Sequence, residues 1–239
     1  MNTVWPMPTS SYDAIATHPG YPIWPSIAPL PNEPMMYHIG APSVENFLVV
    51  AEAWGQLVSR ELTPSARVLD IGCGCGRTAR MLLYHPFIDA YVGFDVIKPY
   101  IEWSTRFLSP LTHGRFQFAH LDVQSDYYNP QGEIAPEEVT FPFPDANFDL
   151  AFAASLFTHL EGPSARHYLS EARRVLAPGG LLIVSVHVKD GAVDDFSGDE
   201  VRAEVREESF VGLASDLGLS LRTKLGAICG QETFIFTAT

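Results

Sequence analysis

The stretch VLDIGCGCGRTAR, residues 68–80, places three glycines at alternate positions directly after an apolar run. Residues 67–71 are predicted to form a short buried strand, and residues 77–85 a helix that stops near Pro86. Glycine adopts positive φ angles at little cost and, having no Cβ, lets the backbone approach a ligand closely. The segment therefore predicts a ligand-binding loop between a strand and a helix.

The residue types of this loop narrow the kind of ligand. A structural zinc site needs four Cys or His ligands in suitably spaced pairs, but one residue separates Cys73 from Cys75, and Cys229 is the only other thiol. No Gly-Lys-Ser/Thr follows, which excludes a P-loop, and Arg77 stands where a dinucleotide fingerprint has its third glycine. The carboxylate of Asp70, two residues before the first glycine, suits a ligand that presents an amine near the loop better than one that presents two phosphates. No metal is expected, and the cysteines are interpreted as small, neutral fillers of a tight turn.

Strands and helices alternate along most of the chain. A helix is predicted from an N-cap at Ser43 to about Arg60, with apolar residues on one face. Several of the later strands are apolar throughout, which is typical of a parallel sheet covered by helices on both faces. The further expected strands are 90–95, 115–120, 148–153 and 181–188, and the further expected helices are 99–108 and 163–176, the last closed by the PGG of residues 178–180.

The C-terminal part departs from this alternation. A helix near residues 209–217 is followed by two expected strands, 219–225 and 233–237, with about seven residues between them. That gap is too short for a crossover helix, so the two strands are predicted to form an antiparallel hairpin. The expected fold class is α/β, with a mostly parallel seven-stranded sheet that ends in this hairpin.

The chain is predicted to consist of an N-terminal arm, residues 1–42, and a single domain, residues 43–239. The arm holds nine of the 19 prolines, so regular helix or strand is not expected there. Its aromatic residues leave two interpretations open, a disordered tail or a segment packed near the cleft of the domain. Two long loops, 123–140 and 189–208, interrupt the core, and the second, which is strongly acidic, is interpreted as a solvated face.

The composition of the chain excludes several classes of protein. The formal net charge of −13 would repel a polyanion, so no nucleic-acid partner is expected. No apolar run approaches the length of a membrane span, and no basic segment followed by an apolar core marks a signal peptide. Three cysteines do not make a disulfide framework, which is consistent with a reducing cytoplasm.

Five segments in order resemble class I, Rossmann-like methyltransferases that use S-adenosylmethionine. LDIGCGCGR is similar to the glycine motif that holds the methionine end of the cofactor in that family. Asp95, in VGFD, matches the acidic residue that takes the ribose hydroxyls, and Asp122, in HLDV, matches the one that accepts from the adenine amino group. FPFPDANFD (141–149) and EARRVLAPGGLLIVS (171–185) are similar to the next two landmarks. The resemblance covers residues 45–239 and implies S-adenosylmethionine as the cofactor.

The resemblance also implies a set of cofactor contacts along the carboxyl edge of the sheet. The residues expected to make them are Asp70, Gly72, Cys73, Gly74, Gly76, Asp95, Val96, Asp122, Val123 and Ser155. Two histidines are expected at the same edge, His159 just after the fourth strand and His187 at the end of the fifth. Because an imidazole titrates near neutral pH, either is a candidate base for removing a proton from an acceptor.

The acceptor is less well defined by sequence. The segment after the fourth strand, AASLFTHLEG, lacks the Asn/Asp-Pro-Pro-aromatic tetrad of DNA and some protein amine methyltransferases. GCGCGR, YNPQG, SLFTHL and GQETFIF are similar to bacterial methyltransferases of sugars and glycans. A hydroxyl of a small molecule or glycan is therefore the expected acceptor. A metabolite amine or carboxylate, or a non-catalytic S-adenosylmethionine-binding protein of the same fold, remains the alternative, and the oligomeric state is not predicted.

Overall fold

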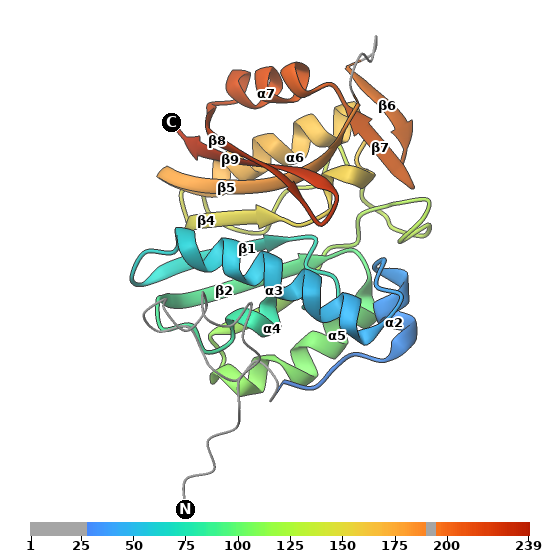
Figure 1. Cartoon of the computed structure of the whole chain (residues 1–239), viewed down its shortest axis with the longest axis vertical. Helices are drawn as coiled ribbons and strands as arrows, with labels where there is room; N and C mark the ends of the chain where they lie inside the picture. Colours follow the sequence, from blue (N-terminus) through green and yellow to red (C-terminus); the bar gives the residue numbers. More distant parts are fainter. Residues whose placement is uncertain (1–27, 190–194) are drawn as a thin grey trace, which may run out of the picture.

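The computed structural model describes residues 28–189 and 195–239. Figure 1 shows a sheet flanked by helices, with the described part of the chain running from α2 to β9. The helices are α2 (Glu33–His38), α3 (Val44–Glu61), α4 (Ala79–Leu82), α5 (Lys98–Phe107), α6 (Gly162–Val175) and α7 (Glu207–Asp216), with short 3-10 helices η2 (Ser109–Thr112) and η3 (Phe157–His159). The strands are β1 (Ala66–Ile71), β2 (Ile88–Asp95), β3 (Phe116–His120), β4 (Phe148–Ala153), β5 (Leu176–Val188), β6 (Phe196–Asp199), β7 (Arg202–Val205), β8 (Leu219–Ile228) and β9 (Gln231–Ala238).

The sheet is mostly parallel. Strands β3, β2, β1, β4 and β5 lie in this order and all run in the same direction, while β9 pairs antiparallel with β5 and β8 with β9. The expected α/β fold with a C-terminal antiparallel hairpin is confirmed. The described residues form nine strands rather than seven, because β6 and β7 continue the sheet beyond the end of β5.

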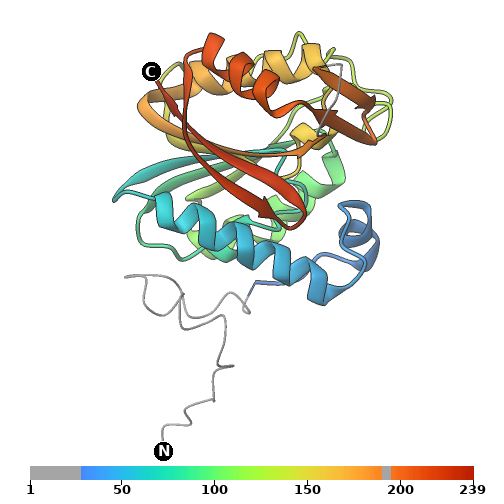
Figure 2. The same cartoon turned by 45° about the horizontal axis from the view of Figure 1, so that its top comes forward.

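Two apolar layers cover the faces of this sheet. Val68 of β1 and Phe152 of β4 pack with Trp54 of α3, whereas their neighbours in sequence, Leu69 and Ala151, belong to the cluster formed by α6 and α7. This alternation follows from the two-residue period of a strand, which points successive side chains to opposite faces. Figure 2 accordingly shows α3 on one side of the sheet and α6 and α7 on the other.

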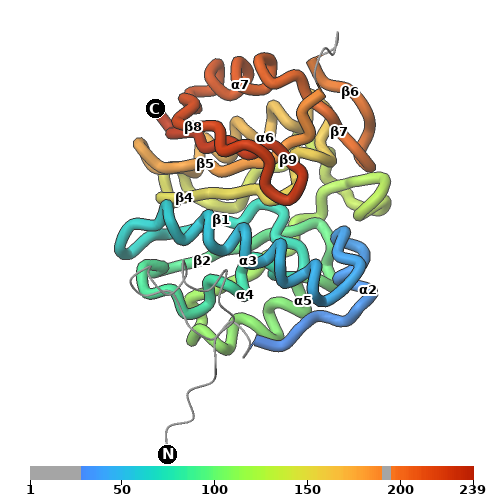
Figure 3. The backbone as a smooth tube through the Cα atoms, in the orientation of Figure 1, coloured from blue at the N-terminus to red at the C-terminus, as the bar shows by residue number. Residues whose placement is uncertain are grey.

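The N-terminal arm contains a helix that composition did not predict. The expectation that residues 1–42 lack regular helix is wrong for α2, and residues 1–27 lie outside the described residues. The side chain of Asn32 caps α2 by accepting from the backbone N–H of Met35 at 2.9 Å, and Pro34 lies in the first turn, where a helix needs no N–H donor. Figure 3 shows α2 beside α5. The contact is made by His38 Nδ1, 2.6 Å from the hydroxyl of Tyr100.

In three further segments a boundary differs from the expected one by three residues or more. Helix α4 is four residues long, because the chain turns through Thr78 before it becomes helical. The PGG of residues 178–180 lies within β5, at an irregularity in its pairing with β4, rather than in a separate turn. The connection between β8 and β9 is two residues long, and both Cys229 and Gly230 have positive φ angles, as the tight turns of twisted hairpins require.

Candidate functional site

A cavity of about 390 Å³ lies at the carboxyl edge of β1, β2 and β4, where a parallel sheet of this kind binds its ligands. Its wall contains nine of the residues singled out from the sequence: Asp70, Gly72, Cys73, Gly74, Asp95, Val96, Val123, Ser155 and His159. Gly76, Asp122 and His187 are not in the wall. The cavity is therefore bounded on one side by the glycine loop and on another by η3.

Asp95 joins the glycine loop to the end of β2. One carboxylate oxygen accepts from the N–H of Gly74 at 2.7 Å, and the other accepts from the N–H of Ile97 at 2.9 Å. Gly72 and Gly74 both have positive φ angles, and a Cβ placed on Gly74 would meet only Ile39 at 3.5 Å. The backbone of the loop thus borders the cavity without side chains in the way.

Asp70 of β1 lines the cavity. It is almost fully buried, and the hydroxyl of Tyr91 donates to its carboxylate. Burial raises the pKa of Asp70 to about 7, although the hydrogen bond from Tyr91 acts in the opposite direction. A carboxyl group with this pKa gains from a cationic neighbour, which favours its charged form.

The two cysteines of the loop are packed inside the protein. Cys73 lies against Gly93 of β2, where an added Cβ would be 2.8 Å from Cys73 Cβ, and Cys75 is buried against α3 and the residues after α2. Burial raises the pKa of Cys75 to about 12 and that of Cys73 well above its usual value, so both remain thiols at neutral pH. A cysteine binds a metal ion in its thiolate form, whereas these two side chains are held in the thiol form.

Two expected cofactor residues have other partners. A Cβ on Gly76 would lie 2.5 Å from Leu108 Cδ1, so this glycine allows the loop to pack against the end of α5. The carboxylate of Asp122 accepts from Asn129 Nδ2 at 3.0 Å, and the same amide donates to the carbonyl of Val123. Asp122 therefore fixes the start of the 123–140 loop, while Val123 faces the cavity.

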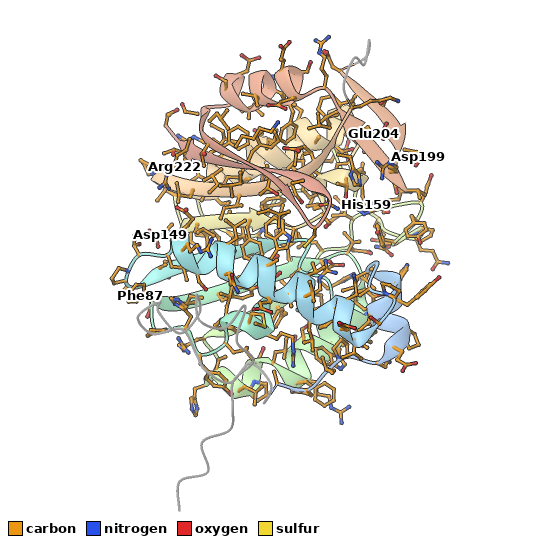
Figure 4. The ribbon with its side chains drawn as sticks, in the orientation of Figure 1. Phe87, Asp149, His159, Asp199, Glu204 and Arg222 are labelled. Carbon is orange, nitrogen blue, oxygen red and sulfur yellow. The ribbon has the colours of Figure 1, made fainter. Side chains whose placement is uncertain are left out.

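His159 has a defined tautomer. Its Nδ1 lies 2.8 Å from the carbonyl oxygen of Glu200, and because a carbonyl only accepts, the proton is on Nδ1. The lone pair is then on Nε2, which lies 3.3 Å from the hydroxyl of Tyr128. Burial lowers the pKa of His159 and keeps the ring neutral. Figure 4 shows His159 beside the β6–β7 hairpin, which carries Asp199 and Glu204.

His187 lies outside the cavity wall. It pairs with Glu204 in the short parallel contact of β5 with β7, and its Nε2 is 3.4 Å from a guanidinium nitrogen of Arg202. Burial and this positive charge lower the pKa of His187. Of the two candidate bases, the structure brings only His159 to the wall of the cavity.

Several residues of the wall were not predicted from the sequence. Glu200 belongs to the acidic segment that was interpreted as a solvated face, and this was wrong for Glu200: its carbonyl holds His159 and its carboxylate accepts from Ser125 Oγ at 2.7 Å. Ile39, directly after α2, also lines the cavity, and the ring of His38 contacts that of Tyr128. A local motif gave no signal for these contacts, because each joins segments far apart in sequence.

Residues 69–184 match the family model of a methyltransferase domain. The chain is 26% identical over 231 residues to the O-methyltransferase cnsE of Penicillium expansum, an alignment that covers 90% of this chain and 76% of that protein. It is also 25% identical over 140 residues to the 2-methyl-6-phytyl-1,4-hydroquinone methyltransferase of Synechocystis sp., covering 59% of this chain. These matches support a class I S-adenosylmethionine-dependent methyltransferase.

Solved structures share the fold of this chain. The 1,6-didemethyltoxoflavin-N1-methyltransferase of Burkholderia thailandensis, whose structure holds S-adenosylhomocysteine, superimposes with a TM-score of 0.60 at 20% identity, over 88% of this chain and 91% of that one. The chain spans less than half of the length of three curated relatives, at 37%, 38% and 45%. Within residues 28–189 and 195–239, which the structure describes, no helix is long and apolar enough to cross a membrane.

Proposed function

We propose that this methyltransferase transfers the methyl group of S-adenosylmethionine directly to a hydroxyl of a small molecule or glycan, with His159 as the base. The observation that carries the proposal is the hydrogen bond from His159 Nδ1 to the carbonyl of Glu200, which leaves the lone pair on Nε2 at the cavity wall. A neutral imidazole in this orientation is suited to accept a proton from a bound hydroxyl.

The inner half of the cavity fits the cofactor. Gly72 and Gly74 leave room for the methionine end, and Asp95 offers carboxylate oxygens to the ribose hydroxyls. Val96 and Val123 supply apolar surface for the adenine ring. When bound here, S-adenosylmethionine supplies a methyl group that its sulfonium makes electrophilic.

The outer half positions the acceptor. Burial raises the pKa of Tyr128 to about 12, so its phenol stays protonated and donates to His159 Nε2. An acceptor hydroxyl that takes over this contact is held with its proton towards Nε2. With the cofactor supplying the methyl group and keeping the sulfur electron pair, His159 Nε2 would take the proton that the acceptor hydroxyl loses. Alignment of the reacting atoms contributes up to about 7–11 kcal/mol, and a positioned base contributes about 10²–10⁴-fold.

The groups around His159 bear on the class of acceptor. The carboxylates of Glu137, Glu161 and Glu200 line the cavity and accept hydrogen bonds, as the hydroxyls of a sugar require. They disfavour a carboxylate acceptor, because like charges repel. They also favour the second candidate, an acceptor amine, and this is the reason to keep an amine-methylating activity as the alternative.

The test is release of S-adenosylhomocysteine over a panel of sugars, glycosides, phenols and amines. With the acceptor that the panel identifies, His159→Ala is expected to lower turnover by roughly 10²–10⁴-fold and to leave the affinity for S-adenosylhomocysteine nearly unchanged. His187→Ala is the matched control and is expected to keep the native turnover. Equal turnover in the native protein and the His159 variant would refute His159 as the base, and a reaction confined to amines would favour the alternative.

A further inference from the structure

Four residues of the cavity wall form a closed cycle of hydrogen bonds that begins and ends on Glu200. Ser125 Oγ donates to the carboxylate of Glu200 at 2.7 Å, and the backbone N–H of Tyr128 donates to Ser125 Oγ at 3.1 Å. The Tyr128 hydroxyl lies 3.3 Å from His159 Nε2, and His159 Nδ1 lies 2.8 Å from the carbonyl oxygen of Glu200. The cycle therefore joins the 123–140 loop, η3 and the turn between β6 and β7.

The direction of each hydrogen bond in the cycle follows from the two acceptors on Glu200. Because an ionised carboxylate only accepts, Ser125 uses its one hydroxyl proton on Glu200 and meets the N–H of Tyr128 as an acceptor. His159 uses its Nδ1 proton on the carbonyl of Glu200, which leaves Nε2 to accept from the phenol of Tyr128. Glu200 thus holds the turn that carries Tyr128 through its carboxylate, and the imidazole through its carbonyl.

Glu200 also places a negative charge beside His159. Burial lowers the pKa of His159, whereas the hydrogen bond to Glu200 and the charge of its carboxylate act in the opposite direction. Strands β5 and β7 pack against η3, and their titratable groups are His187, Arg202 and Glu204. Glu204 already forms ion pairs with Lys189 and Arg202. The further carboxyl groups of the wall belong to Asp70, Asp95, Glu137 and Glu161. Within the described residues, Glu200 is the one of these acids that hydrogen-bonds to the imidazole.

We propose that Glu200 is a positioning residue for proton transfer, whose carbonyl orients His159 and whose carboxylate holds Tyr128 at Nε2 and stabilises the protonated imidazole. This inference rests on the proposed role of His159 as the base. The imidazolium that forms when Nε2 takes a proton gains from a nearby carboxylate, because an opposite charge favours the charged form. Nδ1 donates to the carbonyl of Glu200 in both protonation states, so the imidazole keeps its orientation during the transfer.

The test separates the charge of Glu200 from its hydrogen bond. Glu200→Gln removes the charge but keeps an oxygen that can accept from Ser125 Oγ, Glu200→Ala removes both, and the carbonyl of residue 200 stays in each. Glu133→Gln removes a charge at an exposed position of the 123–140 loop outside the cavity wall and is the control. NMR of the ¹⁵N-labelled histidines measures the pKa and the tautomer of His159 without turnover, and its signal is assigned by its loss in His159→Gln.

Glu200→Gln is expected to lower the pKa of His159, to keep the proton of the neutral ring on Nδ1, and to move the midpoint of the pH–rate profile to lower pH by the same shift. Glu200→Ala is expected to lower the pKa as well, and to lower turnover at pH 8 by roughly 10- to 100-fold. The reason is that a loosely held base loses part of the about 10²–10⁴-fold that a positioned base contributes. The control should change neither quantity.

The outcomes separate this inference from the proposed function. An unchanged pKa of His159 in Glu200→Gln overturns the inference, and so does a neutral His159 of the native protein with its proton on Nε2. A loss of turnover in Glu200→Ala without a change in the pKa also overturns it, since Glu200 would then serve only the fold. If Glu200→Ala fails to fold, Ser125→Ala, which breaks the same bridge from the loop, is measured in its place. Native turnover of His159→Ala contradicts the proposed base instead, and the NMR result still decides whether Glu200 orients and charges the imidazole.

Discussion

Replacing Gly76 by alanine tests whether this glycine serves packing or ligand binding. Gly76 has a φ angle of +72°, and an added Cβ would lie 2.5 Å from Leu108 Cδ1 and 3.2 Å from Ser104 Oγ. The left-handed conformation costs a residue with a Cβ roughly 1–2 kcal/mol, and overpacking a close-packed interior costs typically about 1–3 kcal/mol. Gly76→Ala is therefore expected to lower the free energy of unfolding by about 2–5 kcal/mol.

Gly230→Ala is the matched control. Gly230 has a φ angle of +82° in the β8–β9 turn, but an added Cβ there would meet nothing within 4 Å. The control should lose only the conformational part, about 1–2 kcal/mol. Equilibrium unfolding in urea, followed by far-UV circular dichroism, measures both variants against the native protein, and equal m-values indicate that the unfolding transition is comparable.

The result that refutes the reasoning is equal destabilisation of the two variants, since the contact with α5 would then contribute nothing. A Gly76 variant of native stability that binds S-adenosylhomocysteine weakly would also refute it, because it would place Gly76 in the cavity wall. The expected result is the reverse, a loss of stability that exceeds that of the control.

Two further predictions concern protonation. Because burial lowers the pKa of His159 and the base must be neutral, turnover should fall as pH drops, with a midpoint below the ordinary value of about 6.5, and a pH–rate profile of the native protein measures it. A midpoint well above that value would contradict His159 as the base. Replacing Cys73 and Cys75 together by alanine should keep calorimetric affinity for S-adenosylhomocysteine within about threefold, because both thiols are buried and protonated. Loss of a stoichiometric metal from that variant would contradict the packing role.

The central strands were predictable because local and global preferences agree there. The strand expected at 148–153 is β4, and those expected at 67–71 and 115–120 differ from β1 and β3 by one residue at their start. β1 and β4 place apolar side chains in the clusters on both faces of the sheet, which helices cover on both sides. Strands β6 and β7 have no such pattern. They are four residues each, and they form because β7 pairs with the exposed end of β5 at His187 and Val188.

The two sides of the cavity also differ in how far the sequence predicts them. The proposed cofactor side is built largely from residues close together in sequence, from Asp70 to Arg77 and around Asp95, so a spacing motif identifies it. The proposed acceptor side joins the end of α2, the 123–140 loop, η3 and the β6–β7 hairpin. The feature that suits His159 to its proposed role as a base is its tautomer, which depends on the main-chain carbonyl of residue 200. Every amino acid supplies such a carbonyl, so no residue pattern marks it, and only the folded chain shows which histidine nitrogen is free to take a proton.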